Sequence, residues 1–497
     1  MGIIEKQAVQ NAVFSYLGAV LGFITVGLIL PNFLTTSENG LLRILISIST
    51  LFAQFSSLGV NGITTRLFPY FRNKENKHHG FLFYPIMASL VGFGICVILF
   101  FVFYNFIIEK NIEKSKLLVE YIYYLLPLTF FTLFFNVLDA YTRSIYSSVV
   151  GTFLKEFLQR IFILAAVGLY YFYSISFSWF VFAYVVAVSL PTLIIAAYII
   201  QQKEWAINPK FSFVNRKMAY EMVSISLFSI LTSFSFVTIS TIDSIIINDK
   251  LGLDATGIYG ITFYFGTIII IPARSILRIS SSILAEAWKH NDIELINKIY
   301  HKSCINQLII GALFLLGIWA NVDNVLKFLP PEYVAGKYVI LFIGIGNLID
   351  MATGLNGAII ATSKYYRYDS FFMLFLVAVT IITNLIFIPI YGIVGSAIAS
   401  SITILSFNTI RYLFIYIKFK MQPFDIQTLK VLIIIIITYL TNLAIPKSSN
   451  FIVDIIIRST IICLVFSVLI IKARVSPDVD SKVSEYSKVL KDYKKRK

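Results

Sequence analysis

The sequence predicts an all-α polytopic membrane protein with about 14 transmembrane helices. Hydrophobic residues make up 58% of its 497 residues and charged residues only 13%, and the mean hydropathy is +0.82. A soluble chain is typically about a quarter charged. Apolar runs long enough to cross a bilayer follow one another along almost the whole chain. The polar segments between them are too short for a separate soluble domain, which needs roughly 50 residues or more.

Each expected span holds about 20 or more mostly apolar residues. The first six occupy Asn11–Pro31, Gly40–Ile63, Phe81–Ile107, Leu117–Tyr141, Val149–Phe172 and Phe177–Ile200. The next six occupy Tyr220–Asn248, Thr256–Ile283, Ser303–Val325, Tyr338–Thr362, Ser370–Ile390 and Gly392–Ile417. A last pair occupies Gln427–Ile445 and Phe451–Ile471. An even number of spans places both ends of the chain on the same side of the membrane.

The distribution of lysine and arginine predicts which side that is, because these residues are enriched in cytoplasmic loops. With the N-terminus inside, the inside loops carry most of the basic residues, above all the loop Lys203–Lys217. Two outside loops, near Ser174 and Tyr391, carry none. The abundance of Ile, Phe, Asn and Lys is typical of AT-rich bacterial genomes. The sequence therefore predicts a bacterial inner (cytoplasmic) membrane protein with both termini in the cytoplasm.

The net charge of +15 gathers in the inside loops and the C-terminal tail. At the inner membrane surface these positions face anionic lipid head groups, which attract them. Membrane lipids are therefore the expected partners of the basic residues, and nucleic acid is not.

Cysteine and histidine show no spacing typical of a metal site. The three cysteines are expected to pack among helices, and the four histidines, His78 among them, to lie in solvated loops. The chain also contains no nucleophile elbow and no phosphate-binding glycine loop. We therefore expect no metal, no cofactor and no catalytic residues, and a carrier rather than an enzyme.

Two local patterns recur about six spans apart. The segment Leu34–Gly40 before the second span resembles Leu251–Gly257 before the eighth, and Asn136–Asp139 resembles Asn347–Asp350. Similar offsets and matching span numbers favour two duplicated lobes of six helices each. Because six is even, the lobes share one topology and bracket a central cavity that can open to either side.

The repeat divides the chain into four parts. Residues 1–213 form the N-terminal six-helix lobe and residues 214–425 the C-terminal six-helix lobe. Residues 426–472 add two transmembrane helices outside the repeat, and residues 473–497 form a basic cytoplasmic tail. The tail spaces apolar residues as a helix would, so it is either an amphipathic helix on the inner leaflet or a disordered segment.

Three stretches resemble a known family. Asp243–Ile247 with Gly257–Tyr259, the segment Asn384–Ala397, and Gly59–Pro69 are similar to polysaccharide exporters of the MOP (MATE-like) flippase superfamily. The resemblance covers nearly the whole chain and implies transport by two lobes that rock about a central site. Fourteen spans match the flippases for O-antigen and lipid-linked precursors, whereas multidrug extruders of the superfamily usually have twelve.

Charged residues at membrane depth are costly and usually face a partner or a wet cavity. Arg43 and Arg274 are candidates for a cationic cavity, because guanidinium keeps its charge and grips two phosphate oxygens at once. Arg66 and Arg278 lie at expected cytoplasmic ends, where contact with the substrate and snorkelling to lipid head groups are equal alternatives.

The acids Asp243, Asp350 and Asp139 are candidates for coupling transport to a proton or a sodium ion. For Asp243 and Asp350 a hydrogen-bonded packing role is an equal alternative. For Asp139 an ion pair with Arg143 is the alternative, and the Glu156–Arg160 and Asp454–Arg458 pairs, also four residues apart, are expected to be structural.

The leading hypothesis is a flippase that carries a polyprenyl-pyrophosphate-linked oligosaccharide across the inner membrane for O-antigen, lipopolysaccharide or capsule synthesis. A MATE-type multidrug or cation antiporter is the first alternative, and it would favour acidic, aromatic-lined pockets. The second alternative is a membrane enzyme acting on lipid-linked sugars, which would need a sizeable outer loop carrying acids or metal ligands.

Overall fold

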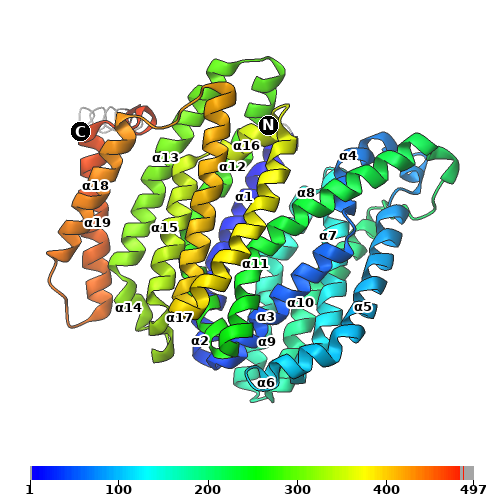
Figure 1. Ribbon diagram of the computed structural model, residues 1–497, viewed down its shortest axis with the longest axis horizontal. Helices are drawn as coiled ribbons and strands as arrows, with labels where there is room; N and C mark the ends of the chain where they lie inside the picture. The colour runs from blue at the N-terminus through cyan, green and yellow to red at the C-terminus, as the bar shows by residue number, and fades with distance from the viewer. Residues whose placement is uncertain (1–2, 482–484, 486–497) are drawn as a thin grey trace, which may run out of the picture. The chain divides into compact units, whose positions relative to one another are not determined.

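The structure is a computed structural model that describes residues 3–481 and residue 485. The side chains of a few helical residues, Arg278 among them, lie outside that description. The described residues are almost entirely helical and contain no β-strand (Figure 1). The prediction of an all-α fold built from apolar helices of membrane length is therefore confirmed.

Nineteen α-helices follow one another along the described chain. The first eleven are α1 (Ile3–Gly22), α2 (Leu30–Phe33), α3 (Thr36–Ser56), α4 (Val60–Phe71), α5 (Phe83–Asn111), α6 (Lys116–Tyr121), α7 (Leu125–Ser144), α8 (Ser148–Thr152), α9 (Gln159–Phe172), α10 (Phe177–Gln201) and α11 (Arg216–Thr267). The others are α12 (Ile271–Lys289), α13 (Ile293–Ala320), α14 (Val322–Leu326), α15 (Lys337–Thr353), α16 (Asn356–Thr362), α17 (Tyr366–Phe419), α18 (Ile426–Leu443) and α19 (Phe451–Ala473).

Ten helical stretches in the described part of the chain are long and apolar enough to cross a membrane. The count is eleven if α3 and α4, which meet at a bend of 46°, form one span. Two of the ten contain α11 and α17, helices of 52 and 54 residues that each kink at a glycine with positive φ, Gly252 and Gly392. Glycine adopts this conformation without a Cβ clash. The kink therefore divides α17 into two halves of membrane length, whereas the shorter second part of α11 continues through Ile268–Ile270 into α12. The number of fourteen spans stays a prediction.

The chain packs as two compact units. Unit 1 comprises Met1–Tyr264 and Met373–Ser396, and unit 2 comprises Phe265–Phe372 and Ala397–Lys497. Each unit has its own buried apolar clusters, for example around Leu41 and Phe68 in unit 1 and around Ile359 and Phe466 in unit 2. These units are defined by packing, whereas the lobes 1–213 and 214–425 are defined by the repeat. The division into lobes stays a prediction.

The last two long helices form a hairpin in unit 2. Figure 1 shows α18 and α19 side by side, and both pack against α13. The chain after α19 then attaches to α13: Lys302 pairs with Asp478 at 2.7 Å, and Ser476 donates a hydrogen bond to Asn306 at 2.7 Å. The beginning of the predicted tail is therefore packed against a helix. Residues 482–484 and 486–497 of that tail lie outside the described residues.

A loop in unit 1 corrects the expectation that His78 is solvated. Its side chain is only 2% exposed. Its Nδ1 accepts a hydrogen bond from the backbone N–H of Asn73 at 3.1 Å, and its Nε2 lies 2.6 Å from a carboxylate oxygen of Glu204. Because Glu204 follows α10, this contact joins two loops that are distant in sequence, which the local polarity of the loop did not reveal.

Candidate functional site

Arg43 lies on α3, two turns after the start of that helix. The helix begins with a capping box, in which Glu38 accepts from the backbone N–H of Thr35 at 2.8 Å and Thr35 accepts from that of Glu38 at 3.2 Å. Such a cap satisfies N–H groups at the helix start and fixes where the helix begins. The cap therefore sets the face of α3 on which Arg43 lies, and this face packs against α11.

Three groups on α11 surround the Arg43 side chain. Its Nε donates to the hydroxyl of Ser244 at 3.1 Å. Its guanidinium carbon lies 5.5 Å from the centre of the Phe263 ring. A Cβ on Gly260 would lie 3.2 Å from the Arg43 Cγ, so the missing side chain leaves room for the aliphatic part of the arginine. No ion pair among the described residues includes Arg43.

Asp243 is buried directly beside this arginine contact. Its side chain is only 2% exposed and accepts hydrogen bonds from the Tyr259 hydroxyl and from the backbone N–H of Ser244. The positive charge of Arg43 acts on the same carboxylate. A buried carboxylate is costly unless hydrogen bonds and an opposite charge compensate it. The structure thus brings together two residues, Arg43 and Asp243, that the sequence nominated separately.

A second guanidinium, that of Arg160 at the start of α9, belongs to the same unit. A Cβ on Gly22 of α1 would lie 2.3 Å from Arg160 Nη1 and 2.5 Å from the Tyr264 hydroxyl, so both groups occupy the space above this glycine. Arg43 and Arg160 both act electrostatically on the buried Tyr184 of α10. Unit 1 therefore holds two guanidinium groups whose charges both reach Tyr184.

Two π-helical turns accompany this arrangement. Phe23–Ile29 follows directly on Gly22, and Phe153–Leu158 precedes the helix that carries Arg160. Gly18 of α1 faces the second of these turns, since a Cβ on Gly18 would lie 2.4 Å from the carbonyl oxygen of Glu156, and Gly22, four residues later, faces Arg160 just beyond that turn. Small residues at this spacing allow close helix contact in membranes, and π-helical turns are frequent at functional sites.

The Glu156–Arg160 pair, expected to be structural, is loose. The Arg160 and Glu156 side chains approach only to 3.8 Å and are 23% and 40% exposed. The Nε atom of Arg160 is buried and has no hydrogen-bond partner among the described residues. A buried N–H donor without an acceptor is costly. Arg160 therefore has donor capacity that Glu156 does not use.

Asp139 on α7 has different neighbours. It pairs with Arg143 at 3.2 Å, one turn further along the same helix. A Cβ on Gly151 would lie 1.7 Å from an Asp139 carboxylate oxygen, so α8 approaches the acid closely. The Asp139–Arg143 ion pair expected from the sequence is present. Asp139 is also a candidate for ion coupling, and in this structure Arg143 is already its partner.

In unit 2, Asp350 on α15 belongs to a network of amides and hydroxyls. The Asn408 side chain of α17 donates to Asp350 at 3.0 Å. Its carbonyl oxygen accepts from Thr353 and from Asn356, each at 2.8 Å. The packing role expected as an alternative for Asp350 is therefore present in the structure. The same oxygen-rich cluster has the ligand chemistry that a small hard cation prefers.

Arg411 lies near this network on α17 and forms a two-point ion pair with Asp369. Its Nε and Nη2 donate to the two carboxylate oxygens at 2.8 and 3.0 Å. Its guanidinium carbon lies 3.7 Å from the centre of the Phe407 ring, and its Nη1 would lie 2.6 Å from a Cβ on Gly357. Planar pairing and ring stacking of this kind are specific to arginine.

The other candidate arginines are less enclosed. Arg66 on α4 and Arg274 on α12 are exposed, and the side chain of Arg278 lies outside the described part of the chain. Arg43 and Arg66 belong to unit 1, and Arg274 to unit 2. The role of these arginines in substrate binding stays a prediction.

The sequence analysis missed Arg411, Tyr184 and Tyr259, and it assigned Arg160 only to an ion pair. Arg411 carries a detectable signal, because it lies inside the expected span Gly392–Ile417, where charge is costly. The two tyrosines carry no such signal, since tyrosine is common throughout this chain.

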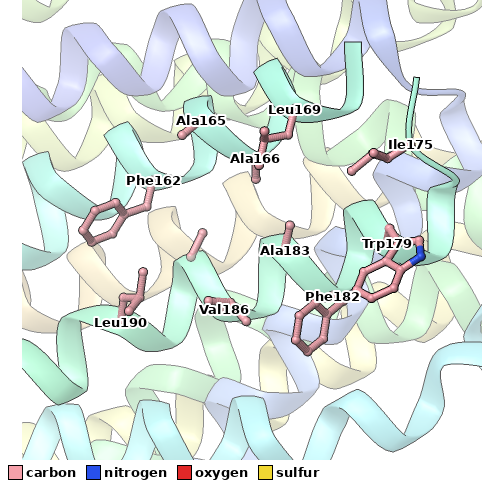
Figure 2. A pocket seen from close by; sticks show the side chains of 11 residues that line it. Phe162, Ala165, Ala166, Leu169, Ile175, Trp179, Phe182, Ala183, Val186 and Leu190 are labelled. Atoms are coloured by element: carbon pink, nitrogen blue, oxygen red, sulfur yellow. The ribbon is translucent and has the colours of Figure 1, made fainter. Parts of the chain in front are cut away.

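An apolar groove lies between α9 and α10 of unit 1. Figure 2 shows side chains of both helices pointing into it, with Trp179 at one end. Its volume is about 420 Å³, and residues such as Phe162, Leu169 and Val186 line it. The groove offers almost no polar group that could orient a ligand.

Comparison with known proteins adds a family and a fold. A family model described as "Polysaccharide biosynthesis protein" matches residues 6–277. No curated protein sequence matches this chain. Its structure is similar to that of the lipid II flippase MurJ in an inward closed conformation, with a TM-score of 0.72 and 15% sequence identity. That match covers 93% of this chain and 98% of MurJ.

Two transporters of the MOP superfamily are also similar. A multidrug resistance MATE family transporter in an inward-facing conformation is 13% identical, with a TM-score of 0.57 over 83% of this chain and 98% of the other. A transporter from Pyrococcus furiosus is 14% identical, with a TM-score of 0.57 over 84% and 96%. At these identities the likeness concerns the fold. The MOP superfamily fold expected from the three sequence stretches is confirmed.

Proposed function

Because the chain belongs to the polysaccharide biosynthesis protein family, we propose that it is a flippase for a polyprenyl-pyrophosphate-linked oligosaccharide. It moves this lipid across the bacterial inner membrane during the synthesis of O-antigen, lipopolysaccharide or capsule. The proposal includes no catalytic step: the protein binds the head group on one side and releases it on the other. The similar fold of a flippase for lipid II, as its name states, supports this class of substrate.

The observation that carries the proposal is the pair of guanidinium groups in unit 1. Arg43 donates to Ser244 and forms no ion pair among the described residues, and the buried Nε of Arg160 has no hydrogen-bond partner there. A pyrophosphate offers several oxygens to such donors, and guanidinium binds them two at a time. Membrane insertion of an arginine costs at least a few kcal/mol. Asp243 offsets part of this cost for Arg43, and a bound pyrophosphate would offset it further.

The Asp243 carboxylate gives the arginine site a means of coupling to an ion. While charged, it attracts Arg43; when it takes up a proton, that attraction ends and the guanidinium is available to an anion. Asp350 with its amide and hydroxyl neighbours is the corresponding candidate in unit 2, for a proton or a sodium ion. Asp139 is the weakest of the three, because Arg143 already pairs with it.

A MATE-type drug or cation antiporter is the second candidate function. The buried acid Asp243 and the half-buried acid Asp350 favour it, and multidrug transporters share the fold. The arginines favour the flippase, because a cationic drug would be repelled by them. A membrane enzyme acting on lipid-linked sugars is the third candidate, and no observation on the described residues favours it.

Deletion of the gene distinguishes these functions. We expect lipid-linked oligosaccharide to accumulate on the inner leaflet and surface polysaccharide to be lost. The measurement is the leaflet distribution of labelled lipid-linked oligosaccharide in membrane vesicles, together with staining of the cell-surface glycan. An unchanged surface glycan with increased sensitivity to cationic dyes would instead support the antiporter.

A further inference from the structure

A polar pocket lies in unit 2 at one end of the α18–α19 hairpin. Its volume is about 480 Å³, which is within the range of small-molecule sites. Helices α13, α14, α15, α18 and α19 all contribute to its wall. It is separate from the Asp350 network and from both arginine sites of the proposed function. The predicted topology places this end of the helices at the outer surface of the membrane.

The floor of the pocket is a completely partnered ion pair. Arg458 donates to Asp454 at 2.7 Å, to the Asn442 side chain at 3.0 Å and to the carbonyl of Ile445 at 3.0 Å. Asp454 also accepts from Asn324 at 2.6 Å. The Arg458 and Asp454 side chains are 8% and 5% exposed. Buried ion pairs persist only with such additional hydrogen bonds, so this floor is a preorganised structural element.

The rim carries three lysines and one acid. Lys337 pairs with Asp323, and Lys447 approaches the same carboxylate only to 3.9 Å. None of the ion pairs among the described residues includes Lys327, whose nearest polar contact is the Asn324 side chain at 3.5 Å. With the floor included, four cationic and two acidic side chains line the pocket. The lining therefore has an excess of two positive charges.

Aromatic rings hold two of these lysines at the rim. The Lys337 ammonium lies 5.6 Å from the centre of the Trp319 ring, and that of Lys327 lies 5.9 Å from the Phe451 ring. Cation–π contacts at this distance are attractive and leave the other N–H groups of each ammonium available. The rings therefore position both ammonium groups, and the charge of Lys327 is not neutralised by any carboxylate among the described residues.

The pocket also lies at the level where the apolar helices end. Helix α14 ends at Leu326, α15 begins at Lys337, and α18 ends at Leu443. Beside it, Leu443 and Leu440 of α18 are 63% and 56% exposed. In a membrane these apolar side chains face acyl chains, whereas the lysines lie at the depth of the head groups.

We propose that this pocket binds the phosphate groups of an anionic phospholipid. The excess of two positive charges matches a head group with two phosphodiesters, such as that of cardiolipin, and the exposed leucines accommodate its acyl chains. A bound lipid of this kind joins the hairpin to α13 and α15. Inorganic phosphate or pyrophosphate has the same chemistry without the acyl chains, so the test includes both sources.

The test uses the purified full-length protein and three lysine-to-glutamine changes, Lys327→Gln, Lys337→Gln and Lys447→Gln, in one variant. A matched control carries Lys114→Gln, Lys116→Gln and Lys250→Gln, which remove three other exposed charges on the predicted outer side. Native mass spectrometry counts bound cardiolipin, phosphatidylglycerol or phosphatidylcholine. Thermal unfolding in the presence of each lipid, or of pyrophosphate alone, measures the stabilisation.

We expect the unchanged protein and the control to retain cardiolipin and to be stabilised by it, and phosphatidylcholine to have no effect. The pocket variant should bind cardiolipin roughly 100-fold more weakly, because each of the three lysines near an anionic lipid contributes about a factor of five. Equal stabilisation by pyrophosphate alone would overturn the assignment to a lipid. Equal cardiolipin binding by the pocket variant and the control would overturn the site itself.

Discussion

Gly40 and Gly257 meet where α3 crosses the second half of α11. A Cβ on Gly40 would lie 2.0 Å from the carbonyl oxygen of Leu253, and a Cβ on Gly257 would lie 2.0 Å from that of Thr36. Gly40 therefore lies against the backbone of Leu253, four residues before Gly257, and Gly257 lies against the backbone of Thr36, four residues before Gly40. These are the two glycines that the repeated sequence pattern aligns, so corresponding positions of the repeat pack against each other with an approximate two-fold relationship.

Replacement of Gly40 or Gly257 by alanine should loosen this helix crossing. The obstructing atoms are backbone carbonyls, which cannot move aside as a side chain would, so we expect a loss of about 1–3 kcal/mol in the free energy of unfolding. Thermal unfolding in detergent measures it. Gly94→Ala on α5 is the matched control, because nothing lies within 4 Å of the added methyl group. Equal stability of the Gly40→Ala and Gly94→Ala proteins would contradict the close crossing.

The contact between His78 and Glu204 should hold two loops of unit 1 together. Glu204→Gln weakens a hydrogen bond to a charged group, which typically contributes about 1.5–3 kcal/mol. We expect faster hydrogen exchange in residues 72–80 and 203–213 of this variant, and no change in Glu75→Gln, which alters an exposed acid of the same loop. Unchanged exchange in both segments would show that the contact does not hold the loops.

Asp425, which caps α18, should make stability depend on pH. Partial burial is the largest single effect and acts to raise its pKa, but the backbone N–H groups of Thr428 and Gln427 and the neighbouring His301 together outweigh it, so the pKa is lowered. A lowered carboxyl pKa stabilises the fold above the unfolded value of about 3.9, and this contribution is lost as pH falls through the folded value.

Asp425→Asn retains a good helix cap but removes the charge. We therefore expect it to melt at a lower temperature than the unchanged protein at pH 7, with the two melting curves converging below about pH 4. The measurement is the melting temperature as a function of pH. A difference that persists undiminished to low pH would mean that the charge of Asp425 is not responsible.

The Arg411–Asp369 pair should behave as a unit. Its side chains are 13% and 17% exposed, so Asp369→Asn leaves a mostly buried guanidinium without its carboxylate. Loss of one partner of a buried pair costs about 3–5 kcal/mol, whereas loss of both can be nearly neutral. We expect low membrane abundance for Asp369→Asn and substantial recovery for Asp369→Asn with Arg411→Gln, measured by quantitative immunoblotting. An additive loss in the double variant would argue against the pairing.

The fold class could be predicted from composition and span length, because a bilayer requires long apolar helices whatever their arrangement. The positions of both kinks also agree with the predicted spans: Gly252 lies between the seventh and eighth spans, and Gly392 is the first residue of the twelfth. The contacts of the site could not be predicted. Arg43 and Ser244 are 201 residues apart in the sequence, and only the packing of α3 on α11 brings them together.

Two errors have the same physical origin. His78 was expected in solvent because its neighbours in the sequence are polar, yet its partner Glu204 is 126 residues away. Arg411 was overlooked inside an apolar span, where Asp369 and Phe407 compensate its charge. In both cases the group that carries the opposite charge is distant in the sequence, Glu204 for His78 and Asp369 for Arg411, and local sequence patterns carry no information about such partners.

The most direct test of the central claim is export by variants of Arg43. Arg43→Ala removes the guanidinium proposed to hold the pyrophosphate, and Arg43→Lys keeps the charge but loses the planar group that grips two oxygens. Lipid-linked oligosaccharide on the outer leaflet is measured together with the amount of protein in the membrane, and Arg367→Ala, at an exposed arginine, is the control. Arg43→Ala should abolish export at near-normal abundance, because Asp243 keeps its hydrogen bonds from Tyr259 and from the backbone N–H of Ser244. Arg43→Lys should restore export in part. Full export by Arg43→Ala would contradict the account.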